Sequence, residues 1–595
     1  MQPLSVLLRL LSLSMLLSAC GIGVDPFPER PLAPARVQVV VPPYPVIADG
    51  QDFLSIEVRF EDVLGREVPG VQPEFLVSGT GGALNCGSSN ARGIAICTFV
   101  PWPWVAGESH IELQSPLRGQ ASFTLTALDS SSFQYRIQGG GTVELPLHSG
   151  GTYAGLTVYW GDGSFSAVSG PNDPSRFHTY ADNSERIVTL NGSFDRLVFY
   201  GHQPERLLDV RYWGNNWSVI TDMRDLFRGC TRLRVFSARD TPDTSLVTSF
   251  ESTFEGAILF NGDVSDWDTA FATSFSRMFK GARSFNQDIS RWSVSNVVDF
   301  SEMFSAENMD LNDPLDPDPA HPMVFNQSLT NWEVSSGLSF SKMFAGAVHF
   351  NQDLSPWNLL SATDLSGMFF HAHAFNMGDT SEGMVDWVQG NASNLSHMFH
   401  DARAFNQDIG AWDVVAVTNM SYLFRDAESF NQPLPNWLTD SLTDLKGMFR
   451  GASAFNQGLN HLNTRGVSDF SEVFMNASSF DNQGISFQWD TGYATNMAYM
   501  FFGTANYQQG FGAKFNVNVV TNFDSMFAFA TLFNGDISTW DTGVAQNMSH
   551  MFESAQAFNG DLSLWDVGFV TQSSNFDLGA KSWDPVNKPN FSGAR

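Results

Sequence analysis

Four histidines lie close together in the sequence and have the residue type that metal chemistry needs: His371, His373, His397 and His400. Imidazole nitrogens are common zinc ligands, and a catalytic zinc keeps a coordination position open. If repeats of this chain stack about 4.8 Å apart, as neighbouring strands do, His371 and His400 could meet on the surface. Equivalent positions of other repeats carry lysine, arginine and glycine, as an exposed and variable surface does. We therefore expect no metal and no cofactor, and keep the four histidines as the candidate zinc ligands.

Paired carboxylates are the second pattern that could do chemistry, because two acids on neighbouring repeats could cleave a polysaccharide. Acids recur at equivalent positions, for example Asp288, Asp353, Asp408 and Asp561. A catalytic pair needs one distinctive environment, whereas a row of acids offers many equivalent ones. Asp162 lies between two glycines and is expected to be a turn residue. The sequence has no nucleophile elbow, phosphate loop or zinc-protease motif. We expect a non-catalytic protein, with a carbohydrate-active enzyme as the alternative.

A third group of side chains, in the segment MDLNDPLDPDPAHP at 309–322, offers the oxygen ligands that calcium prefers. The spacing lacks the central glycine and the terminal glutamate of an EF-hand. We expect a solvated loop here and leave calcium as the alternative. The oxygen-bearing residues are Asp310, Asn312, Asp313, Asp316 and Asp318.

The element that must position these residues is a repeat of about 25 residues, clearest in FKGARSFNQDISRWSVSNVVDFSEMF at 279–304. A phenylalanine anchors each copy, and a fixed period over this many copies indicates a stack of repeats. The thirteen anchors are Phe227, Phe254, Phe279, Phe304, Phe344, Phe369, Phe399, Phe424, Phe449, Phe474, Phe501, Phe527 and Phe552.

Counting each anchor as position 0, apolar residues recur at −4, −1, 0 and +3. These spacings predict one face of a short helical turn. Serine is common at −3, where its hydroxyl could cap that turn. Apolar residues at +6, +10 and +13 predict an extended segment with one face inward. One such unit cannot bury its aromatic face alone, so the repeats must stack.

Stacking predicts a core made of a column of aromatic rings, since each repeat offers two phenylalanines and usually a tryptophan. Burial of each phenylalanine contributes roughly 1.5–3 kcal/mol. Asparagine recurs at +7, where its amide should link one repeat to the next. The stretch Tyr507–Phe515 lacks the Phe-Asn step of the motif and predicts an irregular column there. The long interval between Phe304 and Phe344 predicts an inserted loop.

The pattern MF-x-x-A-x-x-FNQD[IL]-S-x-W-D-V resembles the repeat of BspA-type, leucine-rich-repeat-like bacterial surface proteins, which also occurs in mycoplasma lipoproteins. The resemblance covers residues 218–578 and implies a cell-surface interaction protein. The fold class expected is mainly β with short helical turns. Two N-terminal β-sandwich domains would precede a right-handed, leucine-rich-repeat-like α/β solenoid of about thirteen coils.

Residues 1–20 are typical of a lipoprotein signal peptide. A short apolar stretch, Leu10–Leu17, is too short to span a bilayer. It leads into Leu17-Ser18-Ala19-Cys20, which matches the lipobox at which such signals are cut. We expect Cys20 to carry the lipid, and an ordinary signal peptide with an incidental cysteine remains the alternative. The proline-rich residues 21–37 suit a tether.

Two β-rich segments follow the tether. Residues 38–128 alternate as β-strands do and resemble bacterial Ig-like domains. Export makes a disulfide possible, and Cys86 and Cys97 are the natural pair, with two free thiols as the alternative. Residues 129–217, with LTVYWGDGSFSAV, resemble a PKD-like domain. Residues 579–595 are expected to form a C-terminal cap or tail, and Cys230 is expected in the core.

The net charge of −30 argues against binding to nucleic acid, which needs clusters of lysine and arginine. We expect a monomer in the bacterial cell envelope, anchored by lipid and surface-exposed. Gly21, rather than aspartate, after the cysteine is compatible with the outer membrane. The expected function is adhesion to an extracellular protein or glycan ligand, and a passive envelope component is a further alternative.

Overall fold

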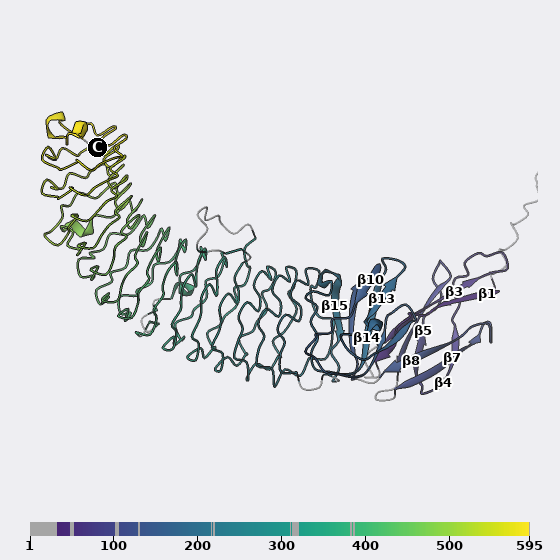
Figure 1. Cartoon of the computed structure of the whole chain (residues 1–595). Helices are drawn as coiled ribbons and strands as arrows, with labels where there is room; N and C mark the ends of the chain where they lie inside the picture. The colour runs from purple at the N-terminus through teal and green to yellow at the C-terminus, as the bar shows by residue number, and fades with distance from the viewer. Residues whose placement is uncertain are drawn as a thin grey trace, which may run out of the picture. The chain divides into compact units, whose positions relative to one another are not determined.

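The chain divides into two compact units in the computed structural model (Figure 1). One comprises residues 1–130 with 161–163, and the other comprises 131–160 with 164–595. The signal segment with Cys20, residues 21–32 of the tether and the oxygen-bearing residues Asp310, Asn312, Asp313, Asp316 and Asp318 lie outside the described residues. The structure describes residues 33–47, 53–101, 106–128, 131–215, 217, 220–306, 308–309, 311, 321–380, 383–384, 387–388 and 390–593.

The fold is mainly β with almost no helix. Every helix in the described residues is a three-residue 3-10 turn, so none has the length or the apolar run that a membrane crossing needs. These turns are η1 (Pro174–Arg176), η2 (Pro204–Arg206), η3 (Met377–Asp379), η4 (Asn482–Gly484), η5 (Pro585–Asn587) and η6 (Phe591–Gly593).

The first unit consists of two four-stranded sheets that share one hydrophobic core. Alternate residues of β3 are buried, as expected of a strand with one face inward. All its strand pairs are antiparallel except β2 with β8. One sheet has the order β1 (Arg36–Val40), β3 (Leu54–Glu61), β6 (Ile94–Pro101), β5 (Gly82–Cys86). The other has the order β2 (Val46–Ile47), β8 (Ser122–Leu128), β7 (Gly107–Ser115), β4 (Glu74–Gly79).

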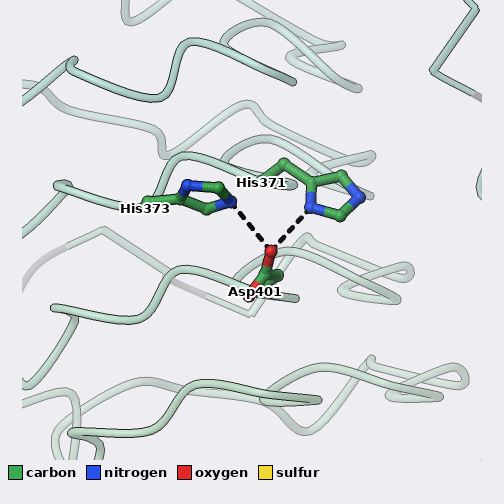
Figure 2. Close-up of side chains that lie close together, drawn as sticks. All are labelled: His371, His373 and Asp401. Atoms are coloured by element: carbon green, nitrogen blue, oxygen red, sulfur yellow. Dashed lines mark hydrogen bonds and ion pairs between the residues drawn. The ribbon is translucent and has the colours of Figure 1, made fainter. Parts of the chain in front are cut away.

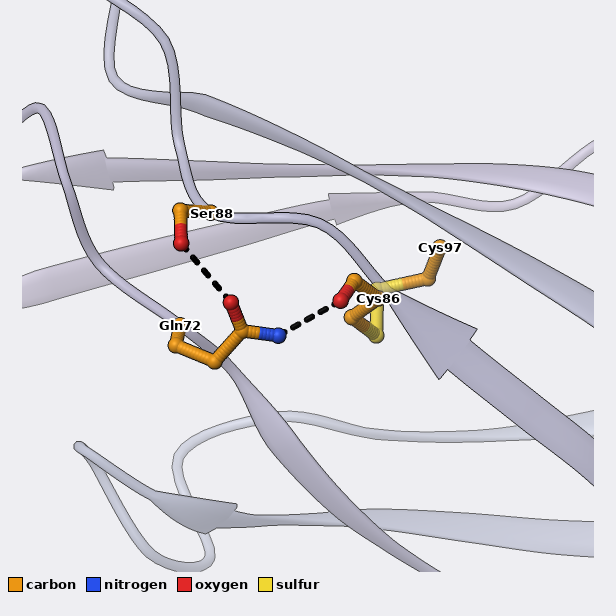
Figure 3. The surroundings of a disulfide bond; sticks show 4 residues. All are labelled: Gln72, Cys86, Ser88 and Cys97. Carbon is orange, nitrogen blue, oxygen red and sulfur yellow. Dashed lines mark hydrogen bonds between the residues drawn. A yellow bond between two sulfur atoms is a disulfide. The ribbon is translucent and has the colours of Figure 1, made fainter.

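A disulfide joins Cys86 and Cys97 across the hairpin of β5 and β6, where the two residues are directly paired (Figure 3). Gln72 spans the same region, since its amide donates to the Cys86 carbonyl and its carbonyl accepts from the Ser88 hydroxyl. The bond closes a loop with a sequence separation of 11 residues. Closing a loop of this size stabilises a fold by about 2–3 kcal/mol.

The second unit begins with a five-stranded sheet in the order β12-β11-β14-β9-β15 and a separate ribbon of β10 and β13. Asp162 lies in the turn between β11 and β12, as expected; the Trp160 N–H donates to the Ser164 carbonyl there, at 3.1 Å. The strands are β9 (Phe133–Gln138), β10 (Gly141–Glu144), β11 (Tyr153–Tyr159), β12 (Phe165–Val168), β13 (Phe177–Tyr180), β14 (Glu185–Phe194) and β15 (Leu207–Tyr212).

This sheet shares one continuous core with the repeats, so no boundary between compact units falls at residue 217. The ring of Phe199 stacks on the first anchor, Phe227, with centroids 5.8 Å apart. Trp213 packs edge-on against the same ring at 6.0 Å. The segment 131–217 therefore closes the N-terminal end of the aromatic core. At the other end, Trp583 packs edge-on against Phe558 at 4.7 Å.

The repeats contain turns where the sequence predicts a helical turn, and this prediction is wrong. In the repeat of Phe279, the N–H groups at −1 and +3 donate to carbonyls three residues earlier, which defines β-turns. The N–H groups at −4, −2, 0 and +2 donate instead to the next repeat, for example from Phe279 to Met303 at 3.0 Å. An α-helix would use all these groups within itself. The apolar periodicity is therefore that of consecutive turns.

These turns place every residue at −2 in the left-handed region, with φ between 53° and 63°. Only two of these residues are glycine, Gly367 and Gly447. The serines at −3 do not cap a helix; the hydroxyls of Ser276 and Ser301 bond each other at 3.0 Å. The other residues at −2 are Asp225, Ser252, Arg277, Glu302, Lys342, His397, Tyr422, Glu472, Tyr499, Ser525 and His550.

The aromatic column is present and continuous. From Phe227 to Phe552, each anchor ring stacks on the next with centroids 5.4–5.9 Å apart. A second column at +6 runs from Phe260 to Phe558 with spacings of 5.6–6.2 Å. Figure 1 shows the repeats following one another as successive coils. The core of this unit is thus built from stacked rings.

The asparagine row at +7 links the repeats as predicted. The side-chain oxygen of Asn261 accepts the backbone N–H of Asn286 at 2.9 Å, and the same bond recurs along the row. The tryptophans add a second link, because the Trp292 indole donates to the Val264 carbonyl of the preceding repeat at 3.0 Å. The side chains of these two rows therefore tie successive repeats together.

The column stays continuous through the stretch where the sequence predicts an irregular column. Tyr507 takes the +6 place, with its ring 6.0 Å from Phe480 and 5.9 Å from Phe533. After the inserted loop, Phe325 resumes the same column between Phe285 and Phe350. An aromatic ring of the right size is enough to continue the stack, whatever the surrounding motif.

We predict that Tyr507→Phe stabilises the protein. The Tyr507 hydroxyl is buried and has no hydrogen-bond partner among the described residues, and burial raises its pKa well above the ordinary value. An unsatisfied buried hydroxyl costs about 1–3 kcal/mol, which phenylalanine would recover. Denaturant unfolding should show this gain, with no change for Tyr493→Phe, whose side chain is exposed. Equal or lower stability of Tyr507→Phe would contradict the packing described.

Candidate functional site

Two of the predicted histidines, His371 and His373, converge on an aspartate that the sequence did not single out, Asp401 (Figure 2). His371 and Asp401 each lie two residues after an anchor, Phe369 and Phe399. Equivalent positions of neighbouring repeats stack, and the His371 N–H accordingly donates to the His400 carbonyl at 2.9 Å. The turn geometry of the repeat thus places an imidazole over a carboxylate.

The Asp401 carboxylate is the centre of this network. Its Oδ2 lies 2.7 Å from His371 Nδ1 and 2.8 Å from His373 Nε2. Arg403 Nε donates to Oδ1 at 2.7 Å, and a second guanidinium nitrogen donates to Oδ2 at 3.0 Å. Asp401 is only 4% exposed, so a buried carboxylate is held by two imidazoles and one guanidinium.

The environment of Asp401 keeps it ionised. Burial alone raises the pKa of this carboxyl, but the hydrogen bonds from His371, His373 and Arg403 outweigh it. The pKa of Asp401 is therefore held well below its ordinary value. A carboxylate that stays charged in the core anchors the two imidazoles in fixed orientations.

His397 and His400 form a second pair beside this network, with their Nδ1 atoms 2.9 Å apart. Such a contact needs one ring to donate and the other to accept. The sequence predicts the positions at +1 and +2 to be exposed, which is wrong for His371 and His400: both are at most 2% exposed, and His397 at −2 is 7% exposed. Aromatic rings cover them, since Phe370 lies 4.2 Å from His371 and 4.8 Å from His400 between ring centroids.

The side chains that could hold a metal are His371, His373 and Asp401, whose ligand atoms lie within 4.8 Å of one another. His371 and His400 do meet, at 5.8 Å between ring centroids, but His400 bonds His397 instead of joining this group. The short His–Asp distances are those of hydrogen bonds, and Arg403 already balances the Asp401 charge. This arrangement favours a hydrogen-bonded network.

A cavity of about 620 Å³ opens in front of the second histidine pair, and His397 belongs to its lining. We call it the 394–472 groove. Two rows of side chains form it, at −5 and −3 of consecutive repeats, together with Tyr422, Arg425, Arg450 and Glu472. The row at −5 is Asn394, Asn419 and Asp444, and the row at −3 is Ser396, Ser421 and Lys446.

Two glycines at −2 make room for the walls of this groove. A Cβ at Gly367 would lie 2.8 Å from a methyl group of Leu311, which comes from the insertion and also lines the groove. A Cβ at Gly447 would collide with the Tyr422 ring. The Lys342 ammonium donates at 3.0 Å to the carbonyl of Met309, which lies close to Leu311 in the sequence. Leu311 and Tyr422 therefore bound the groove.

The sequence contained a signal for Asp401 that the period of 25 obscures. The interval between Phe369 and Phe399 is longer than in most repeats, so His371 and Asp401 do not align at the usual spacing. Counting from each anchor places both at +2, and places His373 and Arg403 at +4. The shared +2 position alone would have predicted the contact between His371 and Asp401.

We predict that Asp401→Asn destabilises the protein by about 2 kcal/mol at neutral pH, because it leaves Arg403 and the imidazoles without their anion. The Asp401 pKa is depressed in the folded state, so its contribution is present above about pH 4 and is lost as the pH falls further. The variant should therefore lose less stability than the parent on acidification.

Denaturant unfolding at several pH values checks this prediction. Asp426→Asn is the matched control, since Asp426 occupies the same +2 position one repeat later with its side chain 41% exposed. The control should change stability by less than about 1 kcal/mol. Equal effects of the two substitutions would contradict the structural role of Asp401.

Comparison with known proteins identifies the repeats. The family model described as "Mycoplasma protein of unknown function, DUF285" matches residues 204–316, 320–382, 377–487 and 482–586. Searches of curated proteins and of solved structures found no match. The first two segments are separated within the insertion, and together the four cover well over half of the chain. The chain therefore belongs to the DUF285 repeat family, which is related to BspA-like repeat proteins.

Proposed function

We propose that the chain is a lipid-anchored bacterial surface protein that binds an extracellular protein or glycan without catalysis. Its repeats would form a right-handed, leucine-rich-repeat-like solenoid of the BspA type. Residues 38–128 would be a bacterial Ig-like sandwich and the 129–217 segment a PKD-like domain. Together these N-terminal parts would hold the repeats away from the membrane.

The observation that carries this proposal is the conformation at −2 of each repeat. Eleven of these residues have positive φ although they are not glycine. The left-handed conformation costs a residue with a side chain about 1 kcal/mol, which glycine avoids. The chain nevertheless has Arg277, Lys342 and Tyr422 there, so these side chains are kept at a cost to stability. Backbone strain kept in this way supports a functional role.

Each repeat has nearly constant positions that build the core and variable positions at its surface, and this difference supports the same proposal. The aromatic, asparagine and tryptophan rows are nearly constant and build the core and the links between repeats. The residues at −2 and +1 differ from repeat to repeat, and several of them line cavities such as the 394–472 groove. A constant scaffold with a variable surface is the arrangement that repeat proteins use for binding.

The anchor is proposed from the sequence of the first residues. Leu17-Ser18-Ala19-Cys20 matches a lipobox, and processing there would place the lipid on Cys20. Several acyl chains on one residue give stable attachment, which a single chain does not. The proline-rich residues after Cys20 would then lift the first β unit off the membrane.

We predict that Cys20→Ala abolishes lipid attachment in the native bacterium. Incorporation of a labelled fatty acid and sedimentation with membranes should both be lost, together with adhesion of intact cells. Cys230→Ala is the matched control, because Cys230 is buried in the core and should not affect labelling. Unlipidated protein inside the cell, or unchanged labelling of Cys20→Ala, would refute the anchor.

A further inference from the structure

We infer that the 394–472 groove binds an acidic polysaccharide segment. This inference rests on the proposed binding function and names the site and the ligand class. It depends on three features of the groove, namely its charge, the period of its polar groups and its aromatic wall.

The charge of the groove is opposite to that of the chain. The chain has 62 acidic against 32 basic residues, whereas the groove has three permanent cations, Arg425, Lys446 and Arg450, against Asp444 and Glu472. Glu472 is held by Arg450 at 2.6 Å, and Asp444 accepts the backbone N–H of Lys446 at 3.0 Å. Cations gathered locally on an acidic protein favour an anionic ligand.

Lys446 stays charged within the groove. Its burial lowers the pKa of the ammonium, but Tyr422, Glu472 and Asp469 outweigh this effect and raise the pKa above its ordinary value. It lies at −3, where the two preceding repeats have Ser396 and Ser421. The groove thus offers neutral hydroxyls followed by one cation along a single row.

The period of the polar groups distinguishes a polysaccharide from a peptide. Asn394 and Asn419 present the same amide one repeat apart, and repeats in a parallel stack are spaced by about 4.7–4.9 Å. Side chains on one face of an extended peptide recur at about 6.7 Å, so their spacing would not match that of the repeats. One pyranose unit is close to one repeat in length. A chain of sugars can therefore present equivalent hydroxyls to successive repeats.

The two asparagines have donors to offer such a ligand. The Oδ1 of Asn394 accepts the Ser396 N–H at 3.1 Å, and the Oδ1 of Asn419 accepts the Ser421 N–H at 2.9 Å. Their Nδ2 groups make no hydrogen bond within the described part of the chain. Each is only partly buried, so its amide can donate to a ligand hydroxyl or carboxylate.

The aromatic wall is Tyr422, whose ring packs against His397 at 5.0 Å between centroids and lies over Gly447. An amphipathic ring with a polar hydroxyl suits the alternating apolar and polar faces of a sugar. The cavity volume of about 620 Å³ is within the range of ligand sites and fits a short oligosaccharide.

The test measures binding of the full-length protein in detergent to hyaluronate, heparin, neutral dextran and polyglutamate. Hyaluronate carries carboxylates alone and heparin also carries sulfates, so the two separate the sources of negative charge. We expect at least one of them to bind more tightly than dextran and polyglutamate, and the affinity to fall as salt is added. Preference for dextran or polyglutamate, or no binding at all, would overturn the ligand class.

Three variants assign the binding to the groove. Lys446→Ala and Tyr422→Gly should each weaken binding by about tenfold or more, the loss of one charged or aromatic contact. Glycine suits the positive φ of 55° at Tyr422, so the backbone should tolerate that change. The matched control Lys514→Ala removes an exposed cation elsewhere and should leave binding within about twofold.

The outcomes separate this inference from the proposed function. If the acidic polysaccharide binds Lys446→Ala and Tyr422→Gly as tightly as the parent, the groove is not the site, although a surface-binding function survives. If adhesion of intact cells persists while purified protein binds no polysaccharide, the ligand class is wrong and the proposed function stands. If adhesion of intact cells does not depend on this protein, the proposed adhesion function is wrong, whatever ligand the groove binds.

Discussion

Face-to-face stacking of phenylalanine rings between successive repeats is the interaction on which the second unit depends. From Phe254 to Phe552 each anchor ring contacts the neighbouring anchor rings and a ring of the second column, at centroid distances of 3.7–5.9 Å. A ring at either end of the column would face water, and the chain covers both ends, with Phe199 and Trp213 at one and Trp583 at the other. The sheet of 131–217 is thus part of the same hydrophobic core.

The stacked core fixes the backbone, and the backbone in turn determines which side chains meet. Alternate N–H groups of each turn bond the next repeat, so equivalent positions lie over one another along the whole unit. This rule brings His371 onto Asp401 and aligns Asn394 with Asn419. The histidine network and the groove therefore both follow from one stacking rule, and His397, which bonds His400 beside the network, also lines the groove.

Much of the core could be predicted from the sequence, because ring type and spacing suffice to define a column. The aromatic rows and the asparagine row at +7 were predicted from these alone. The helical turn was wrong, since spacings of three and four residues suit consecutive β-turns as well as a helix, and the deciding bonds run between repeats. At Tyr507 the motif changes while the ring remains, so the column continues through the stretch expected to be irregular. The burial of His371 and His400 could not be predicted, as it depends on the neighbouring Phe370 ring.

Cysteine cross-linking tests the stacking most directly. The hydroxyls of Ser276 and Ser301, at −3 of adjacent repeats, lie 3.0 Å apart, a separation that suits a disulfide between cysteines at these positions. The account predicts that Ser276→Cys with Ser301→Cys forms an intramolecular disulfide on mild oxidation. Ser276→Cys with Ser366→Cys, which places the thiols at −3 of repeats further along the stack, should stay reduced. A reduced adjacent pair, or equal cross-linking of both pairs, would contradict the stacked column of rings.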